Sequence, residues 1–212
     1  MTRIAVIGGT GYAGSHIVTE GVSRGHTVVS VARKVPAERV EGATYLEGTL
    51  LDVPALVAQL DGVDVVVVSV APRGDMAGQV RPNVALLAES LPEHVRLGVI
   101  GGAGGSLVAP GGPRVVESGF PDEFKDEALE AIGVLDDLQA GDGTRDWFFV
   151  HPAGGFGAWN PGERTGTYRD GGDVLVTDDA GESFISGPDL GVAVIDEIER
   201  PRHVRERFTV GY

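Results

Sequence analysis

A glycine-rich turn near the amino terminus constrains the fold of this chain more than any other feature. The turn covers residues 8–14 and separates the mostly apolar run Arg3–Ile7 from an amphipathic stretch over residues 11–24. A short run rich in β-branched residues predicts a buried strand, and apolar residues at helical spacing predict a helix. A strand, a tight turn and a helix in this order predict the first unit of a sheet whose parallel strands are joined by helices.

The same alternation continues along the chain. Further strands are predicted at residues 27–32, 43–46, 63–70, 95–100 and 147–150, and the helices between them at residues 53–60, 83–91 and 121–138. Short strands at residues 174–176, 183–185 and 207–210 are expected around a last helix at residues 189–199. The valine-rich run at 63–70 lacks polar alternation, which predicts a strand buried on both faces. We therefore predict an α/β fold built on a mostly parallel sheet.

Length and composition favour a single domain over residues 1–212. A typical domain has about 150 residues, and 42% of this chain is hydrophobic, which is enough for a sizeable core. The formal net charge of −14 disfavours nucleic acid and anionic membranes as partners. The lack of cysteine excludes disulfides and thiolate metal sites, and the histidines show no paired metal spacing. No targeting segment or membrane span is recognised, so we expect a cytoplasmic protein.

Two irregular segments interrupt the alternation, at residues 101–119 and 151–172. The first is rich in glycine and proline, and the second carries Arg164 and Tyr168. Both follow predicted strands, and ligands of open parallel sheets bind at the carboxyl ends of the strands. We therefore expect the two segments to line one cleft that takes a small-molecule substrate. Arg164 and Tyr168 are candidates to bind an anionic or aromatic substrate, with a packed turn as the alternative.

The glycine-rich turn matches two phosphate-binding patterns at once. G-x-x-G-x-x-G begins at Gly8, and G-x-G-x-x-G begins at Gly9. Glycines permit a tight turn and let backbone amides approach a pyrophosphate at the amino terminus of the helix. A turn without function is the alternative, which the strand before it and the helix after it disfavour. The candidate cofactor-binding residues here are Gly8, Thr10, Gly11, Tyr12, Ala13 and Gly14.

The end of the second predicted strand indicates which dinucleotide is preferred. An acidic residue about 20 residues after the glycines usually holds the ribose hydroxyls of NAD. Here Arg33 and Lys34 occupy that place. Two cations favour the additional phosphate of NADP (NADPH), with NAD as the other cofactor that fits the turn. A solvated basic pair is the alternative interpretation.

Two further strand ends are expected beside the cofactor. Leu51 and Asp52 follow the third strand, where Asp52 can accept a hydrogen bond from an adenine amino group or can cap the next helix. Ser69, Val70 and Ala71 end the fourth strand next to the turn. Their backbone should border the cofactor ribose.

Taken with these residues, several motifs make the chain resemble the atypical short-chain dehydrogenase/reductase superfamily. The likeness is to its small NAD(P)H-binding members of the flavin reductase-like and epimerase-like type. The motifs are residues 8–14, Arg33, residues 99–107, residues 161–168 and the ending at residues 207–212. This resemblance implies a Rossmann-like, doubly wound sheet, a cofactor in the cleft and a substrate over the nicotinamide between the two long loops.

The proton-transfer chemistry of many short-chain dehydrogenases is not expected here. Their Tyr-x-x-x-Lys dyad is absent, because no tyrosine of this chain is followed four residues later by lysine. The resemblance to flavin and biliverdin reductases suggests a serine after the fifth strand and a histidine after the sixth, for which Ser106 and His151 are the candidate catalytic residues. The alternatives are a turn hydrogen bond for Ser106 and a backbone hydrogen bond for His151.

The leading functional hypothesis is an NADPH-dependent oxidoreductase. It would transfer a hydride to a conjugated or aromatic acceptor such as a flavin or quinone, with solvent or a weak acid supplying the proton. The alternatives are a non-catalytic NAD(P)-binding redox sensor of the NmrA type and an epimerase or isomerase that uses bound NAD(P). The sequence leaves the oligomeric state open between a monomer and a homodimer.

Overall fold

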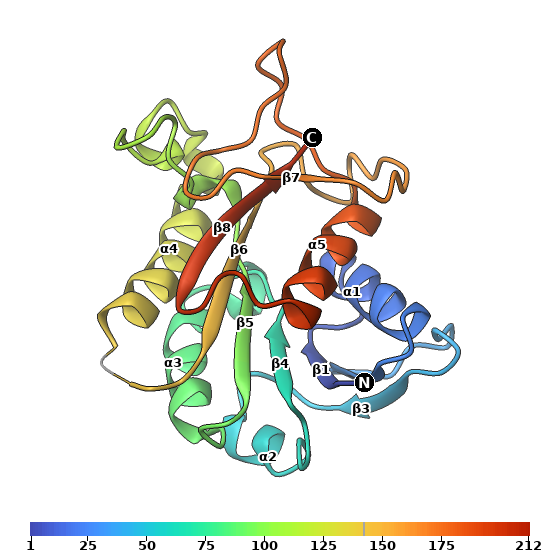
Figure 1. Cartoon of the computed structure of the whole chain (residues 1–212). Helices are drawn as coiled ribbons and strands as arrows, with labels where there is room; N and C mark the ends of the chain where they lie inside the picture. Colours follow the sequence, from blue (N-terminus) through green and yellow to red (C-terminus); the bar gives the residue numbers. More distant parts are fainter. Residues whose placement is uncertain (142) are drawn as a thin grey trace.

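Runs of β-branched residues pair into one eight-stranded sheet with helices on both faces in the computed structural model, which describes residues 1–141 and 143–212 (Figure 1). The strands are β1 (Arg3–Ile7), β2 (Thr27–Ala32), β3 (Thr44–Glu47), β4 (Val65–Val68), β5 (Arg96–Ile100), β6 (Trp147–Pro152), β7 (Arg169–Asp170) and β8 (Glu206–Gly211). The helices are α1 (Tyr12–Ser23), α2 (Val53–Val57), α3 (Val80–Ser90), α4 (Lys125–Ala140) and α5 (Gly187–Glu199). The expected Rossmann-like, doubly wound α/β fold is confirmed.

The order of the strands reverses direction beside β1. The order is β3-β2-β1-β4-β5-β6-β8-β7, and every neighbouring pair is parallel except β7 with β8. The chain therefore builds outward from β1 to β3 and then returns to place β4 on the other side of β1. Ala5 is level with Val29 of β2 and with Val66 of β4. The carboxyl ends of these strands open side by side at the reversal, where ligands of such sheets bind.

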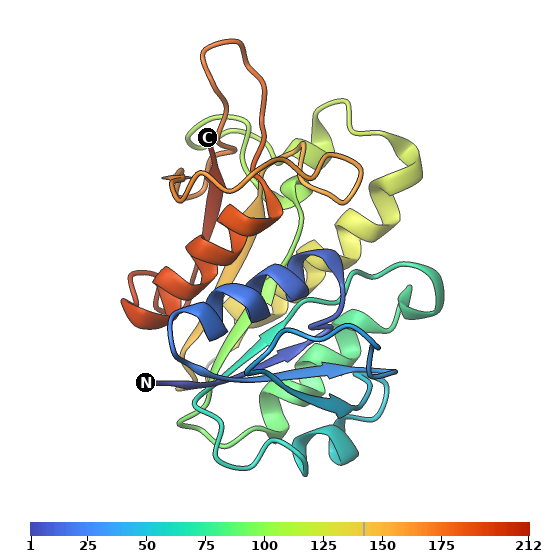
Figure 2. The ribbon, with the colours of Figure 1, turned by 90° about the vertical axis from the view of Figure 1, so that its right-hand side faces the viewer.

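Each face of the sheet has its own apolar layer. Val65 and Val67 of β4 belong to the layer beneath α1 and α5, and Val66 and Val68 belong to the layer beneath α2, α3 and α4. All four side chains are at most 5% exposed, so the prediction of a strand buried on both faces is confirmed. Burial of each such side chain stabilises the fold by about 1.5–3 kcal/mol. Figure 2 shows α1 and α5 side by side on one face of the sheet.

The carboxyl-terminal third departs from the sequence prediction, although the other elements agree to within a few residues. The predicted strands at residues 174–176 and 183–185 are wrong, because these segments form loop. A single bridge joins Leu107 to Val174 instead. Ile185 is fully buried, so the apolar residues of this region mark core packing and not strand. One of the two outermost strands of the sheet is the two-residue strand β7, which the sequence pattern does not predict.

A buried ionic cluster fixes α5 against the sheet. Arg96, at the start of β5, donates from Nη2 to Glu197 Oε1 of α5 at 2.6 Å. The ring of His203 lies between Glu197 and Asp170, with its nitrogens 2.7 Å from Glu197 Oε2 and 3.0 Å from Asp170 Oδ2. Burial lowers the pKa of His203, but the hydrogen bonds with Asp170 and Glu197 outweigh it and raise that pKa to about 9. His203 is therefore an imidazolium at neutral pH.

Replacing His203 by glutamine should remove stability that depends on pH. Because the folded-state pKa lies above the ordinary value of 6.5, the stabilisation is fully present below that pH and is lost as pH rises through about 9. We expect wild type and H203Q to differ by about 1–3 kcal/mol in free energy of unfolding at about pH 6, and by less at about pH 10. Urea unfolding at the two pH values measures this, and a difference that does not change with pH would contradict it.

Candidate nucleotide-binding site

Close backbone packing shapes the glycine turn between β1 and α1. Gly8 has a φ of +81°, and its amide donates to the Val31 carbonyl at 2.9 Å. A Cβ on Gly8 would lie 2.3 Å from the Ser69 carbonyl oxygen, and a Cβ on Gly14 would lie 2.2 Å from the Gly8 carbonyl oxygen. Side chains at these two positions are therefore excluded. The glycines bring the start of α1 against the ends of β1 and β4.

The first turn of α1 presents backbone donors that the described part of the chain does not use. Gly11 is the N-cap residue, and it supplies no side-chain hydrogen bond to the helix. The Gly11 amide donates to Gly8, whereas the amides of Tyr12, Ala13 and Gly14 have no acceptor within residues 1–141 and 143–212. Unpaired amides at a helix amino terminus carry partial positive charge and bind phosphate groups. The expected phosphate cradle therefore has the donors that a diphosphate requires.

A pocket of about 260 Å³ adjoins this turn. Gly9, Thr10 and Ser15 form one side, and the segment after β2, with Pro36, Glu38 and Arg39, forms the other. Arg39 lies 5.8 Å from the ring centroid of Tyr45, so it adds a cation to the pocket wall. Arg39 was not among the residues expected from the sequence. Its spacing of six residues after Arg33, in the same segment, was the available signal.

Arg33 and Lys34 lie directly after β2, as expected from the sequence, and both are exposed. The Arg33 guanidinium forms an ion pair with Asp75, which lies in the turn Gly74–Met76 after β4. The side chains of this pair are 63% and 60% exposed. Asp75 was not a sequence candidate, because 42 residues separate it from Arg33.

The residues that follow β4 contact the glycine turn, whereas Asp52, which follows β3, has a different partner. Ser69 continues β4, where its amide donates to the Ile7 carbonyl at 2.8 Å and its carbonyl faces Gly8, so Ser69 and Val70 border the turn as expected. Asp52 instead caps α2, with Oδ1 accepting from the Ala55 amide at 3.1 Å. The capping interpretation of Asp52 is therefore confirmed. Its contact with adenine, and that of the half-exposed Leu51, stay predictions.

The two candidate catalytic side chains are enclosed. His151 is 1% exposed and Ser106 is fully buried. The Nδ1 atom of His151 is 2.7 Å from the Gly102 carbonyl oxygen, while His151 Nε2 and Ser106 Oγ have no partner within the described part of the chain. Burial lowers the pKa of His151 to about 4, so the ring is neutral near pH 7. Neither side chain is open to a ligand in this structure, and the backbone contact is the alternative considered for His151.

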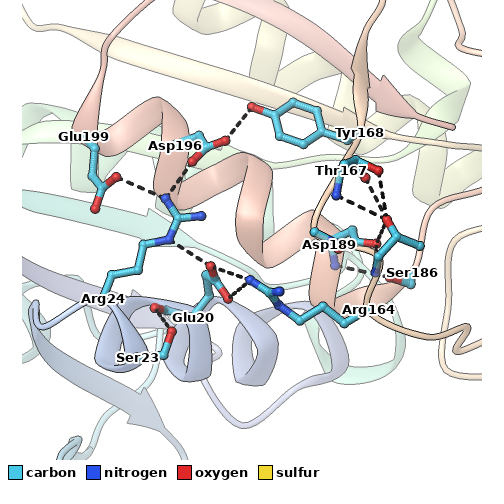
Figure 3. Close-up of polar contacts among 12 residues, drawn as sticks. Glu20, Ser23, Arg24, Arg164, Thr167, Tyr168, Ser186, Asp189, Asp196 and Glu199 are labelled. Atoms are coloured by element: carbon cyan, nitrogen blue, oxygen red, sulfur yellow. Dashed lines mark hydrogen bonds and ion pairs between the residues drawn. The ribbon is translucent and has the colours of Figure 1, made fainter.

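Arg164 and Tyr168 contact helices instead of lining the glycine turn (Figure 3). The Arg164 guanidinium donates to both carboxylate oxygens of Glu20 in α1, at 3.2 and 3.3 Å. The Tyr168 hydroxyl donates to Asp196 of α5 at 3.2 Å, and burial together with Asp196 raises the pKa of Tyr168 to about 12. These contacts correspond to the packed-turn interpretation. They disfavour the predicted role of the two residues in substrate binding.

The motif at residues 161–168 is held to α5 by a buried carboxylate. Asp189, which is fully buried, accepts hydrogen bonds from the amides of Thr165 and Gly166, both at 2.8 Å, and from the Thr165 hydroxyl at 2.7 Å. The hydroxyl of Tyr212 also donates to this carboxylate. Burial raises the pKa of Asp189, but these hydrogen bonds dominate and lower it. Residues 161–168 therefore attach the second long loop to α5.

Tyr12 joins this loop to the glycine turn. Its hydroxyl donates to the Pro161 carbonyl at 3.0 Å and accepts from the Gly187 amide at 3.1 Å. The ring of Phe156 packs on the Tyr12 ring at a centroid distance of 5.2 Å. The backbone of Tyr12 thus belongs to the candidate phosphate cradle, while its side chain holds the loop and the start of α5.

Comparison with known families agrees with this geometry. The profile of a family described as NAD(P)H-binding matches residues 8–172, a span that contains the glycine turn, Arg33 and both long loops. The chain belongs to this NAD(P)H-binding family. Among curated proteins, the NAD(P)H-binding chain is similar to the uncharacterized YwnB of Bacillus subtilis (strain 168), with 33% identity over 98% of this chain and 97% of YwnB.

Two solved structures resemble this NAD(P)H-binding protein over almost their whole length. SP1627 from Streptococcus pneumoniae TIGR4, described as a candidate NADH-flavin reductase, is 30% identical with a TM-score of 0.88, covering 100% of this chain and 99% of that one. A candidate epimerase from Bacteroides thetaiotaomicron is 30% identical with a TM-score of 0.87, covering 100% and 97%. The expected resemblance to small NAD(P)H-binding proteins of the flavin reductase-like and epimerase-like type is confirmed.

The residues of this NAD(P)H-binding protein fit a nicotinamide dinucleotide. The free amides of α1 suit its diphosphate, and the adjoining pocket, whose lining includes the cation Arg39, has room for its adenosine half. Within residues 1–141 and 143–212, no group of three His, Cys, Asp or Glu side chains is placed to hold a metal ion. None of the helices in that part of the chain has the length and apolarity needed to cross a bilayer.

Replacing Gly14 by alanine should weaken coenzyme binding through the turn. The added Cβ would meet the Gly8 carbonyl at 2.2 Å, which pushes α1 away from β1 and moves its amides. We expect the Kd for NAD(P)H to rise about tenfold or more and the free energy of unfolding to fall by about 1–3 kcal/mol. Calorimetric titration and thermal unfolding measure the two effects. Gly143→Ala, where a Cβ meets no atom within 4 Å, is the matched control, and equal effects of the two substitutions would contradict this prediction.

Proposed function

We propose that this protein is an NADPH-dependent oxidoreductase that passes a hydride to a conjugated or aromatic acceptor such as a flavin or quinone. Membership of the NAD(P)H-binding family and similarity to SP1627 support a general NAD(P)-dependent oxidoreductase-like role. The observation that carries the proposal is that Arg33 and Lys34 follow β2, the neighbour of β1, at the same end of the sheet as the free amides of α1. Diphosphate and ribose phosphate of NADPH would then each meet groups of opposite charge.

The enclosed His151 and Ser106 favour an acceptor that needs no protein acid. A flavin or quinone ring takes a hydride from the reduced nicotinamide and one proton from solvent, and it leaves as the two-electron-reduced form. The protein then has to bind both rings, hold them in contact and exclude competing reactions. Alcohol dehydrogenation requires a positioned base that takes the hydroxyl proton, and neither enclosed side chain is open to a substrate hydroxyl in this structure.

The cofactor assignment predicts a selective loss on removing the two cations. In the double variant Arg33→Ala, Lys34→Ala, we expect the Kd for NADPH to rise by about 10-fold to 100-fold, because one or two charge-assisted hydrogen bonds to the phosphate are lost. The Kd for NADH should change by less than about threefold, since NADH lacks that phosphate. Titration calorimetry with both coenzymes measures this. Equal losses for NADPH and NADH would remove the phosphate assignment.

Activity is tested by following NADPH oxidation with a panel of flavins and quinones. Turnover with at least one conjugated acceptor is expected. A non-catalytic sensor of the NmrA type is the second candidate, and the enclosure of both candidate catalytic side chains is the observation that favours it. Tight NADPH binding with no turnover across the panel would favour the sensor function over the oxidoreductase function.

Replacing His151 by glutamine should change stability more than turnover. Because the pKa of the buried ring is lowered to about 4, a pH–rate profile should show no ionisation near 6.5 from this residue. We expect kcat of H151Q within about threefold of wild type and a free energy of unfolding reduced by about 1–2 kcal/mol, since the contact with Gly102 is altered. A loss of kcat of more than about 100-fold, together with a lost ionisation, would instead assign the proton transfer to His151.

A further inference from the structure

The ion pair between Arg33 and Asp75 spans the edge of the sheet at which the coenzyme is proposed to bind. Arg33 follows β2, Asp75 follows β4, and β1 lies between these two strands. The glycine turn leaves the end of β1, so the pair joins the two segments that flank the free amides of α1. An exposed pair of this kind contributes less than about 1 kcal/mol to folding. Its position therefore bears on ligand binding more than on stability.

The segment that carries Asp75 is held in place from the opposite side by α4. Arg73 donates to Glu127 of α4 at 2.7 Å. Glu130 of α4 accepts from the amides of Gly78, Val80 and Arg81, at 2.5, 2.8 and 3.1 Å. Because both ends of the turn are fixed in this way, the Asp75 carboxylate has a defined place opposite Arg33.

We propose that Asp75 sets the coenzyme preference by competing with the ribose phosphate of NADPH for the Arg33 guanidinium. The inference rests on the proposed function, in which Arg33 binds that phosphate. A phosphate that pairs with Arg33 must displace the carboxylate and then lies near a like charge, which costs affinity. The ribose hydroxyls of NADH carry no charge and can donate hydrogen bonds to the same carboxylate. Asp75 therefore reduces the difference between the affinities for NADPH and NADH that Arg33 and Lys34 create.

The test is the Kd for each coenzyme in Asp75→Asn, which keeps the size of the side chain and removes its charge. We expect the Kd for NADPH to fall about fivefold or more at low salt, and this gain to shrink in high salt because the pair is exposed. The Kd for NADH should stay the same or rise by up to about threefold, because a hydrogen-bond acceptor for the ribose is weakened. Thermal unfolding confirms that the variant is folded, and Asp75→Ser is a second variant with the same expectation.

Two further variants make the test specific. Asp61→Asn removes the same charge from an exposed position before β4. This position lies at the amino-terminal end of the strand, away from the proposed coenzyme site, so both Kd values should be unchanged. In an Arg33→Ala background, Asp75→Asn should improve NADPH binding by clearly less, because only the repulsion between the carboxylate and the phosphate is then removed and the competition for Arg33 is absent. The inference fails if Asp75→Asn behaves like Asp61→Asn, or if its gain is as large without Arg33 as with it, while wild type still binds NADPH. Failure of wild type to bind either coenzyme would remove the proposed function, and this inference with it.

Discussion

The contact of Gly14 with the Gly8 carbonyl is the constraint on which the candidate site depends. It lets α1 begin within a few ångströms of β1, so that the free amides of its first turn open at the same edge as the ends of β1 and β4. The positive φ of Gly8 and the nearby Ser69 carbonyl allow no side chain there. The basic segment after β2 reaches this place because β2 pairs directly with β1. Local backbone sterics therefore determine where negative charge can be bound.

The face of the sheet covered by α1 and α5 stabilises the site from behind. The two helices are joined by ion pairs, in which Arg24, the residue directly after α1, contacts Asp196 and Glu199 of α5 at 2.6 and 3.0 Å. The loop after β6 is attached to the same helices through Arg164, Tyr168 and the buried Asp189 (Figure 3). The long loop is thus positioned by many directed polar contacts. Its attachment to α1 and α5 explains why these polar residues do not line the glycine turn.

Much of the fold could be predicted from the sequence, as could the positions of the glycine turn and the basic segment in the candidate site, because the signals for them are local. The unit of strand, turn and helix around residues 8–14 and the cations at the end of β2 are contiguous in the chain. Asp75 could not be found in this way, since its relation to Arg33 depends on β1 lying between β2 and β4. The burial of His151 also depends on a distant segment, residues 102–106, which folds over the end of β6. Sequence position alone correctly placed His151 at a strand end without showing what covers it.

The double attachment of Tyr12 has a mechanical consequence for the whole binding edge. Its main chain is part of the first turn of α1, and its hydroxyl bridges Pro161 and Gly187. Any displacement of the loop at Pro161 or of the start of α5 is therefore transmitted through one rigid ring to the free amides of that turn. By reciprocity, a ligand that immobilises those amides also restrains the loop, so the two halves of the edge should order together. One aromatic side chain thus couples the first turn of α1 to the second long loop and to the start of α5.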